Sequence, residues 1–205
     1  MVRSVKSMNA AVDELARREK AFAAVLKKHG RPEPRVSDPG ATTLLRTIVG
    51  QQVSVAAARS MWNKLEAAFG SPPDLALLLK ASDEELRAAG MSRQKAGYIR
   101  SLAELVLSGD LDLDRLPADD EEAIALLTLI KGIGRWSAEI YLLFAEGRAD
   151  VWPAGDLAVQ IEIGRLLGFE EKPSEKALRE LAEAWRPHRG AAAVLAWHSY
   201  NSSVL

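Results

Sequence analysis

The apolar residues of this chain recur at helical spacing almost from end to end, and no stretch of useful length alternates as a β-strand would. The first predicted helix ends near Gly30, with one apolar stripe formed by Val12, Leu15, Phe22 and Leu26. Three prolines at 32, 34 and 39 then indicate a linker. The pattern therefore predicts an all-α fold of about nine or ten helices.

Helix-breaking and helix-capping residues predict where the other helices begin and end. A long helical stretch is expected over about 42–69, with a break at Gly50-Gln51-Gln52, and Ser82-Asp83-Glu84-Glu85 reads as a capping box that begins another helix. Acidic residues 119–122 favour a helix start, because negative charge complements the helix dipole. Further helices are expected over 92–107 and near 135–146, 156–168, 174–185 and 188–200.

A length of 205 residues suits one compact domain or two small lobes that share a core. The N-terminal helix cannot bury its stripe alone. We therefore expect a single domain, 1–205, in which a middle lobe covers about 42–130 and the N-terminal helix joins 131–205 in a second lobe.

The chain contains no cysteine, which excludes disulfides, thiolate zinc sites, cysteine nucleophiles and cysteine-ligated iron–sulfur clusters. No apolar run approaches the roughly 20 residues that span a bilayer, and charged residues stand where a signal peptide needs an apolar segment. We expect a cytoplasmic protein, nucleoid-associated if bacterial, with no membrane partner.

The formal net charge is −1, but the charge is unevenly distributed. Between Asp110 and Glu122 lie seven acidic residues and one base, Arg115, so the rest of the chain carries +5. Segments 87–100 and 185–198 contain bases and no acids. Such local basic faces permit nucleic-acid binding without requiring it, and ordinary solvated charge is an equally good explanation.

Two glycines, Gly132 and Gly134, flank Ile133 between two apolar helical runs. This spacing favours a tight turn whose amides lie at the start of the next helix, where they can bind a phosphate oxygen. Lys131 and Arg135 add positive charge beside it. Taken alone, the pattern is more typical of a plain inter-helix turn. It is not a dinucleotide fingerprint, because no strand precedes it and the third glycine is missing.

About twenty residues later, Val151-Trp152-Pro153-Ala154-Gly155 forms a Pro/Gly loop that ends at Asp156. Asp156 is predicted to be the N-cap of the helix that follows, and a lone aspartate at this position is usually only a cap.

Together, the glycine turn, the helix and the Gly/Pro loop with its aspartate resemble the helix-hairpin-helix DNA glycosylases (HhH-GPD). Ile48-Val49-Gly50-Gln51-Gln52-Val53-Ser54 resembles the loop that this superfamily inserts into the minor groove, and residues 92–99 resemble its SxxKAxYI helix. Trp185-Arg186-Pro187-His188-Arg189 resembles the W-[RK]-P-x-R segment of the 3-methyladenine DNA glycosylase II (AlkA-type) branch. The resemblance covers roughly residues 40–200.

This resemblance implies a two-lobed all-α glycosylase fold without an N-terminal β domain. Trp136 stands where bifunctional relatives carry a Schiff-base lysine, so the resemblance implies a monofunctional hydrolase without lyase activity. No iron–sulfur cluster is expected. The carbonyls of Thr128, Ile130 and Ile133 match those that hold a Na⁺ or K⁺ ion in the presence of DNA. The implied partner is double-stranded DNA containing alkylated bases, bound by a monomer.

By the same resemblance, Asp156 is the catalytic carboxylate, and Trp136 and Trp197 are the aromatic faces of the base pocket, with core packing as the alternative for each tryptophan. Ile140 and Leu157 complete this pocket at positions where relatives carry aromatics, which predicts a narrower or shifted substrate range. Gln52 is the expected wedge that fills the gap left by the flipped nucleotide, with a plain helix-surface role as the alternative. The remaining expected DNA contacts are Gln51, Ser54, Arg93, Lys95, Lys131, Gly132, Ile133, Gly134 and Arg135.

The leading functional hypothesis is hydrolytic release of 3-methyladenine, with 7-methylpurines as further candidates, in base excision repair. Two alternatives remain open. One is a glycosylase of the same fold for deaminated or oxidised bases. The other is a damage-sensing DNA-binding protein without catalysis.

Overall fold

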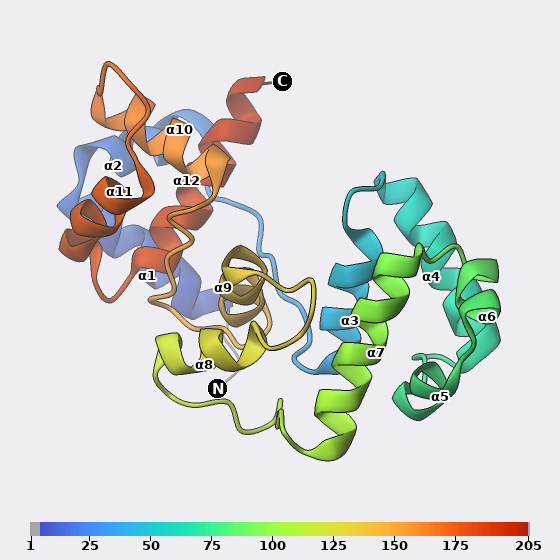
Figure 1. The fold of residues 1–205 in the computed structure, drawn as a ribbon. Helices are drawn as coiled ribbons and strands as arrows, with labels where there is room; N and C mark the ends of the chain where they lie inside the picture. Colours follow the sequence, from blue (N-terminus) through green and yellow to red (C-terminus); the bar gives the residue numbers. More distant parts are fainter. Residues whose placement is uncertain (1–4, 205) are drawn as a thin grey trace. The chain divides into compact units, whose positions relative to one another are not determined.

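The structure of the protein is a computed structural model that describes residues 5–204 and places twelve α-helices and one 3-10 turn among them, with no strand in that range. The all-α prediction is thus confirmed (Figure 1). The helices are α1 (Val5–Arg18), α2 (Lys20–His29), α3 (Ala41–Gly50), α4 (Val55–Phe69), α5 (Leu75–Lys80), α6 (Asp83–Ala88), α7 (Arg93–Ser108), α8 (Asp120–Leu127), α9 (Arg135–Phe144), α10 (Leu157–Leu167), α11 (Glu175–Ala182) and α12 (Arg189–Val204).

Two helices exceed the predicted number. The single N-terminal helix is in fact α1 and α2, separated at Glu19, whose backbone is extended and whose side chain accepts a bond from the Ala21 amide. The second addition is α5, six residues long and capped by Asp74. No helix among residues 5–204 is long and apolar enough to cross a membrane.

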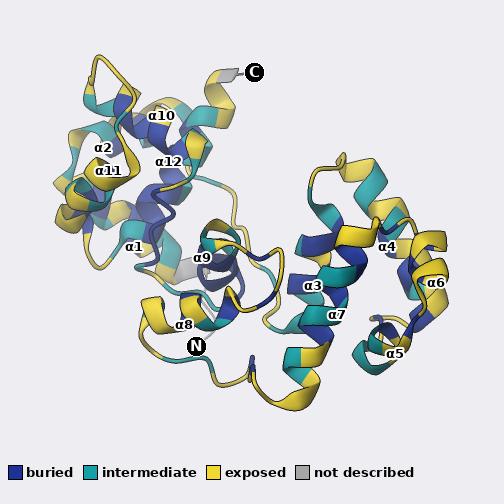
Figure 2. Ribbon diagram, viewed as in Figure 1, coloured by how far each residue is buried: buried dark blue, intermediate teal, exposed yellow. Residues whose placement is uncertain are grey.

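Contacts divide the chain into two units, which are described separately. Unit 1 contains the residues up to Val36 and those from Leu142 onward. Within it, α12 packs against α1, α2 and α10, and Figure 2 shows that much of α12 is buried. Three aromatic rings join the sides of this core: Trp185 lies edge-on to both Phe22 and Trp152, with ring centroids 5.1 and 5.5 Å away.

The beginning of α12 is fixed by an ion-pair network and a close backbone approach. The Arg189 guanidinium donates to both carboxylate oxygens of Asp150, at 3.0 and 2.9 Å. Gly190 donates to the Ala149 carbonyl at 3.0 Å, and a Cβ at Gly190 would lie 2.7 Å from that oxygen. The segment that resembles W-[RK]-P-x-R therefore anchors the helix that carries Trp197.

Unit 2 contains residues 37–141. Its central helix, α7, packs against α3, α5 and α6, and buries Ile99 and Leu102 completely. The capping box predicted at Ser82 is present, with both reciprocal bonds to Glu85. The Ser92 hydroxyl caps α7 by accepting the Lys95 amide.

The end of unit 2 does not coincide with the predicted lobe boundary at about residue 130. The sequence places residues 131–141 with the terminal lobe, whereas the structure assigns them to unit 2. The cause is local packing: the glycine turn sits against Tyr98 of α7, and Gln51 bonds to the turn's backbone.

Candidate active site

The glycine turn between α8 and α9 is built by short backbone bonds. The Ile130 amide donates to the Leu127 carbonyl at 3.2 Å, and the Ile133 amide donates to the Ile130 carbonyl at 3.0 Å. Ile130 and Ile133 are buried. Gly132 has φ +83°, a left-handed conformation that favours glycine, and a Cβ there would overlap the Tyr98 ring. The amides of Gly132 and Gly134 have no hydrogen-bond acceptor among the described residues.

The charged residues beside this turn differ from one another. Lys131 is exposed, and its amide bonds to the Ser101 hydroxyl at 3.1 Å. Arg135 is instead paired with Glu121 and with the buried Glu139, at 2.8 and 3.0 Å, and these carboxylates raise the pKa of its guanidinium. Arg135 therefore links α8 to α9, whereas Lys131 has no ion pair with any residue that the structure describes.

The wedge loop, defined here as Gly50–Ser54, lies beside the glycine turn within unit 2. The Gln51 side chain donates to the Gly132 carbonyl at 2.8 Å, and the Ser54 hydroxyl caps α4 by accepting the Ala57 amide. Gln52 is exposed and has φ +55°, rare for a residue other than glycine. The two predicted segments are thus brought together.

Lys95, expected on the DNA-binding surface, is only 9% exposed. Its ammonium donates to the Val49 carbonyl at 2.6 Å, and burial lowers the pKa of Lys95. Arg93, two residues earlier, is exposed at the first position of α7. Arg93 is therefore exposed, whereas Lys95 is largely buried and lines a pocket of about 310 Å³ together with Gln51 and Gln52.

The first turns of α9 carry the predicted aromatic Trp136, which is 48% exposed. Such exposure is unusual for a tryptophan and argues against core packing. Ile140, one turn later, is half-buried. Thr128 is the C-cap residue of α8, and the Thr128 hydroxyl donates to the Ala125 carbonyl at 2.9 Å.

The Gly/Pro loop belongs to unit 1 and is rigidly held. Val151, Trp152 and Ala154 are buried, and the Trp152 indole donates to the Leu178 carbonyl at 3.2 Å. Gln160 donates to the Ala154 carbonyl at 2.8 Å and accepts from Lys172 at 2.5 Å. These contacts fix the backbone on which Asp156 stands.

Asp156 is the N-cap of α10, as predicted, and is half-buried. Its Oδ1 accepts two N–H bonds, from the Val159 amide at 2.9 Å and from the Trp197 indole at 3.0 Å. The next residue, Leu157, is 61% exposed, so an apolar side chain borders the carboxylate. The bond from Trp197 is the main feature that the sequence does not reveal, because 41 residues separate the partners.

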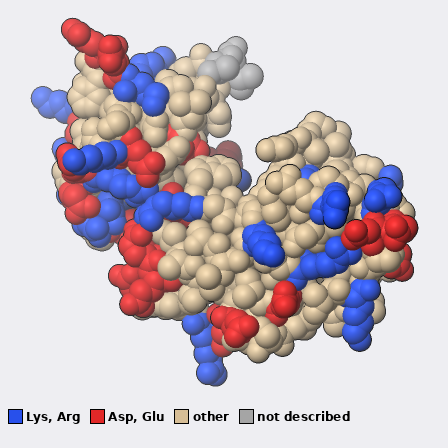
Figure 3. Space-filling view, in the orientation of Figure 1, with Lys and Arg blue, Asp and Glu red and all other residues tan. Residues whose placement is uncertain are grey.

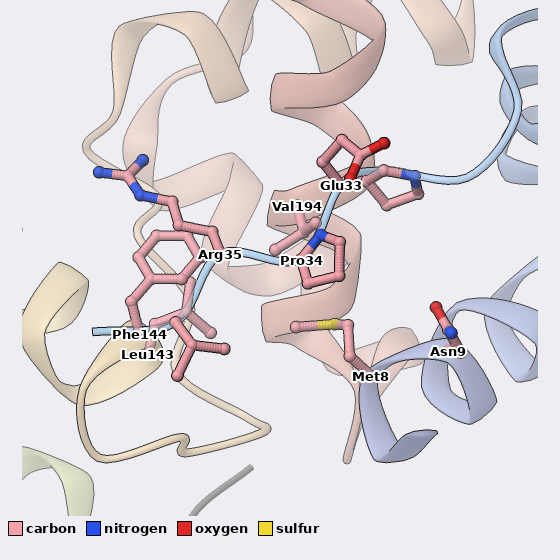
Figure 4. Close-up of a pocket in the computed structure, with 10 residues that line it drawn as sticks. Met8, Asn9, Glu33, Pro34, Arg35, Leu143, Phe144 and Val194 are labelled. Carbon is pink, nitrogen blue, oxygen red and sulfur yellow. The ribbon is translucent and has the colours of Figure 1, made fainter. Parts of the chain in front are cut away.

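The ring of Trp197 continues into an aromatic row. Phe144 lies 5.7 Å from it, centroid to centroid, and the Arg35 guanidinium lies 4.5 Å from the centre of the Phe144 ring. A pocket of about 200 Å³ opens along this row, lined also by His198 and Asn201. A small neighbouring pocket of about 30 Å³ is shown in Figure 4, where the linker passes Phe144, Val194 and Met8. Of these lining residues, the sequence indicated only Trp197.

The negative charge near the glycine turn is concentrated at the beginning of α8. The acidic residues Asp120, Glu121 and Glu122 occupy the first turn of α8, and Figure 3 shows acidic side chains gathered there. They complement the N-terminal dipole of α8. No cluster of three or more metal-binding side chains occurs in the described range.

The all-α fold, the glycine turn and the capped aspartate define a class of DNA repair proteins. Residues 45–187 match the family described as HhH-GPD superfamily base excision DNA repair protein, and the chain belongs to this family.

Individual relatives support the same assignment. The chain is 33% identical to DNA-3-methyladenine glycosylase 1 of Schizosaccharomyces pombe, over 79% of this chain and 72% of that protein. It is 29% identical to DNA-3-methyladenine glycosylase 2 of Escherichia coli, over 85% of this chain but only 64% of the relative.

Solved structures of two relatives share the fold. The S. pombe 3-methyladenine DNA glycosylase (Mag1) in complex with abasic DNA superposes with a TM-score of 0.78 at 28% identity, covering 96% of this chain and 97% of the other. The DNA-3-methyladenine glycosidase from Bacillus halodurans gives a TM-score of 0.84 at 32% identity, covering 96% and 90%.

Substituting Gly132 tests how tightly the glycine turn is built. We expect Gly132→Ala to lower the free energy of unfolding by about 1–3 kcal/mol, because the residue must keep a left-handed φ and displace the Tyr98 ring. Gly134→Ala is the matched control, since a Cβ there meets nothing within 4 Å. Urea denaturation of both variants measures the difference, and equal losses would show that the turn does not need glycine at 132.

Proposed function

We propose that this protein is a monofunctional DNA glycosylase that hydrolytically releases alkylated purines, 3-methyladenine above all, from double-stranded DNA. Membership of the HhH-GPD family supports the reaction class, and the relatives named for 3-methyladenine support the substrate class. The observation that carries the proposal is the Asp156 carboxylate, fixed at one oxygen by two N–H donors and standing at the start of α10.

The proposed reaction breaks the bond between the C1′ carbon of deoxyribose and the base nitrogen. The electron pair of that bond leaves with the base, a water oxygen adds to C1′, and the proton of that water passes to the Asp156 carboxylate or to solvent. An N3- or N7-alkylated purine is already cationic, so it departs as a neutral base without a strong acid. The anionic carboxylate stabilises the positive charge that develops on the sugar.

The two hydrogen bonds to Oδ1 give Asp156 a defined orientation. The Val159 amide and the Trp197 indole both donate to this atom. A carboxylate held in this way does not need to reorganise when charge develops, which is the condition for electrostatic stabilisation of a transition state. Trp197 is thereby a positioning residue for the carboxylate as well as an aromatic surface.

Substrate selection rests on aromatic faces. An aromatic ring attracts a desolvated cationic base by about 0.5–2 kcal/mol, and the proposed faces are Trp136 and Trp197. Trp136 is exposed and Trp197 lines a pocket with Phe144, so both rings have accessible area. Ile140 in unit 2 and Leu157 in unit 1 each supply apolar area without a π-face, which favours a narrower set of lesions than aromatic residues at these positions would.

The glycine turn is proposed to bind the phosphate backbone of DNA. The amides of Gly132 and Gly134, which have no acceptor among the described residues, and the ammonium of Lys131 suit a phosphate group. The carbonyls of Thr128, Ile130 and Ile133 are neutral oxygen donors, which suit Na⁺ or K⁺, and such an ion would add positive charge beside the phosphate. Binding as a monomer is part of the proposal.

Release of radiolabelled bases from methylated DNA, resolved by chromatography, tests the function directly. We expect 3-methyladenine as the main product. A panel of deaminated and oxidised bases distinguishes the alternative substrate class. Lesion binding without release of any base would identify a damage sensor instead.

Replacing Asp156 by Asn separates binding from chemistry. The Asn Oδ1 can still accept both N–H bonds, so the fold is retained, but the negative charge is lost. We expect base release to slow by about 100-fold or more, while binding of a lesion duplex changes by only a few-fold. Single-turnover release and fluorescence anisotropy measure the two quantities. Release at the wild-type rate would remove Asp156 from the mechanism.

Replacing Trp197 by Phe keeps a ring but removes the N–H bond to Asp156. We expect release to slow about tenfold, because the carboxylate loses one of its two fixed donors. Trp62→Phe is the matched control: it removes a buried indole of unit 2 whose N–H has no partner among the described residues, so it should lower stability by about 1 kcal/mol without slowing release in the folded protein. Equal slowing in both variants would mean that the Trp197 bond has no specific role.

Binding should weaken as salt is raised, because phosphate contacts release counterions, with a logarithmic slope of roughly −0.9 per contact. Lys131→Ala should make this slope shallower by about one, whereas Lys80→Ala, an exposed lysine on α5, should leave it unchanged. Titrations at several NaCl concentrations give the slopes. A salt-independent affinity would contradict the role given to the glycine turn.

A further inference from the structure

The wedge loop (Gly50–Ser54) has a backbone that its own sequence does not favour. Gln52 has φ +55°, which is rare for a residue other than glycine. A non-glycine residue in the left-handed region persists when surrounding contacts determine its conformation. Contacts from outside the loop must therefore hold it.

Two such contacts come from other parts of unit 2. On the side of the glycine turn, the Gln51 side chain bonds to the Gly132 carbonyl. On the other side, α3 ends at Gly50, which leaves the carbonyls of its last turn without helical partners. The Gln51 amide occupies the Ile48 carbonyl at 3.3 Å, and the Lys95 ammonium occupies the Val49 carbonyl at 2.6 Å.

The setting of Lys95 is not that of a surface cation. Its side chain is nine-tenths buried, and no acidic side chain of the described residues pairs with it. A buried ammonium is costly unless its donors are used. Here its positive charge meets the C-terminal end of α3, where the helix dipole favours a cation. The charge is thus directed at the backbone immediately before the wedge loop.

We propose that Lys95 is a positioning residue for base extrusion: by binding the Val49 carbonyl it fixes the end of α3, and so sets how Gln52 is presented to DNA. This inference rests on the proposed glycosylase function. Extrusion of the base and cleavage of its bond to the sugar are separate steps, and we assign the wedge loop to the first because it resembles the loop that the family inserts into the minor groove. Loss of the Lys95 contact should therefore slow release only where a paired base must be expelled.

The test uses two duplexes that differ in pairing. An oligonucleotide with a single adenine is annealed to its complement and then methylated with dimethyl sulfate, because pairing blocks N1 of adenine and leaves N3 open to the reagent. The methylated strand is repurified and annealed either to its full complement or to a complement with an abasic analogue opposite that adenine. Lys95→Met should release 3-methyladenine about tenfold more slowly from the paired duplex, and within twofold of the wild-type rate from the other. Lys80→Met is the matched control and should match the wild type on both.

Coupling to the loop is measured with a double variant. If Lys95 acts through Gln52, adding Gln52→Ala to Lys95→Met should slow release from the paired duplex by no more than twofold beyond the slower single variant. A multiplicative effect of the two substitutions would overturn the proposal, because it would mean that they act independently.

A second readout needs no DNA. In Lys95→Met, hydrogen exchange at the amides of residues 48–51 should be faster by about tenfold, because the end of α3 frays, while the amides of Leu195 and Ala196 in α12 stay as protected as before. If Lys95→Met does not fold, Lys95→Gln serves in both experiments with the same expected pattern.

The outcomes are distinct. Equal slowing on both duplexes, unchanged release from both, or unchanged exchange at residues 48–51 would overturn the role of Lys95 while leaving the glycosylase proposal intact. If the wild type releases no 3-methyladenine from either duplex, the proposed function fails, and the role of Lys95 fails with it.

Discussion

One carboxylate oxygen, Oδ1 of Asp156, joins the beginning of α10 to α12. The Val159 amide binds it locally, as in any capped helix, and the Trp197 indole binds it from a distant part of the chain. The second bond makes the geometry of the carboxylate depend on where α12 lies. Two contacts in unit 1 fix the position of α12. Asp150 and Arg189 anchor its start, and Gly190 approaches Ala149 so closely that there is no room for a side chain at position 190.

In unit 2, long-range contacts fix backbone segments, as the Trp197 bond fixes the Asp156 carboxylate in unit 1. The glycine turn, the wedge loop and the start of α7 hold one another through single contacts from Gln51, Lys95 and Tyr98. Each contact fixes the conformation of a backbone segment that lies outside a helix or at the end of one. The apolar core between α3 and α7 contributes the stability of the unit, and these contacts determine the conformation of its loops.

Local features were readable from the sequence, and contacts across the chain were not. Helical periodicity, the capping box at Ser82 and the cap at Asp156 depend on residues a few positions apart, and all three are confirmed. The break at Glu19 was missed because the apolar stripe continues across it, and α5 because six residues show no period. The bond from Trp197 to Asp156 and the burial of Lys95 depend on tertiary packing, for which a single sequence carries no local signal. The sequence around Lys95 is typical of a surface cation, because nothing near it reveals that its ammonium donates to the Val49 carbonyl at the end of α3.

The order of the chain through its two units has a consequence for biosynthesis. Unit 2 is one continuous segment, whereas the core of unit 1 joins α1 and α2 to residues beyond Val151. On a ribosome, residues 37–141 emerge complete while the apolar faces of Val12, Leu15 and Phe22 still lack their partners. Domains generally fold as they are made, and contacts that close long loops form slowly. The N-terminal helices therefore lack their packing partners until nearly the whole of this sequence has been translated.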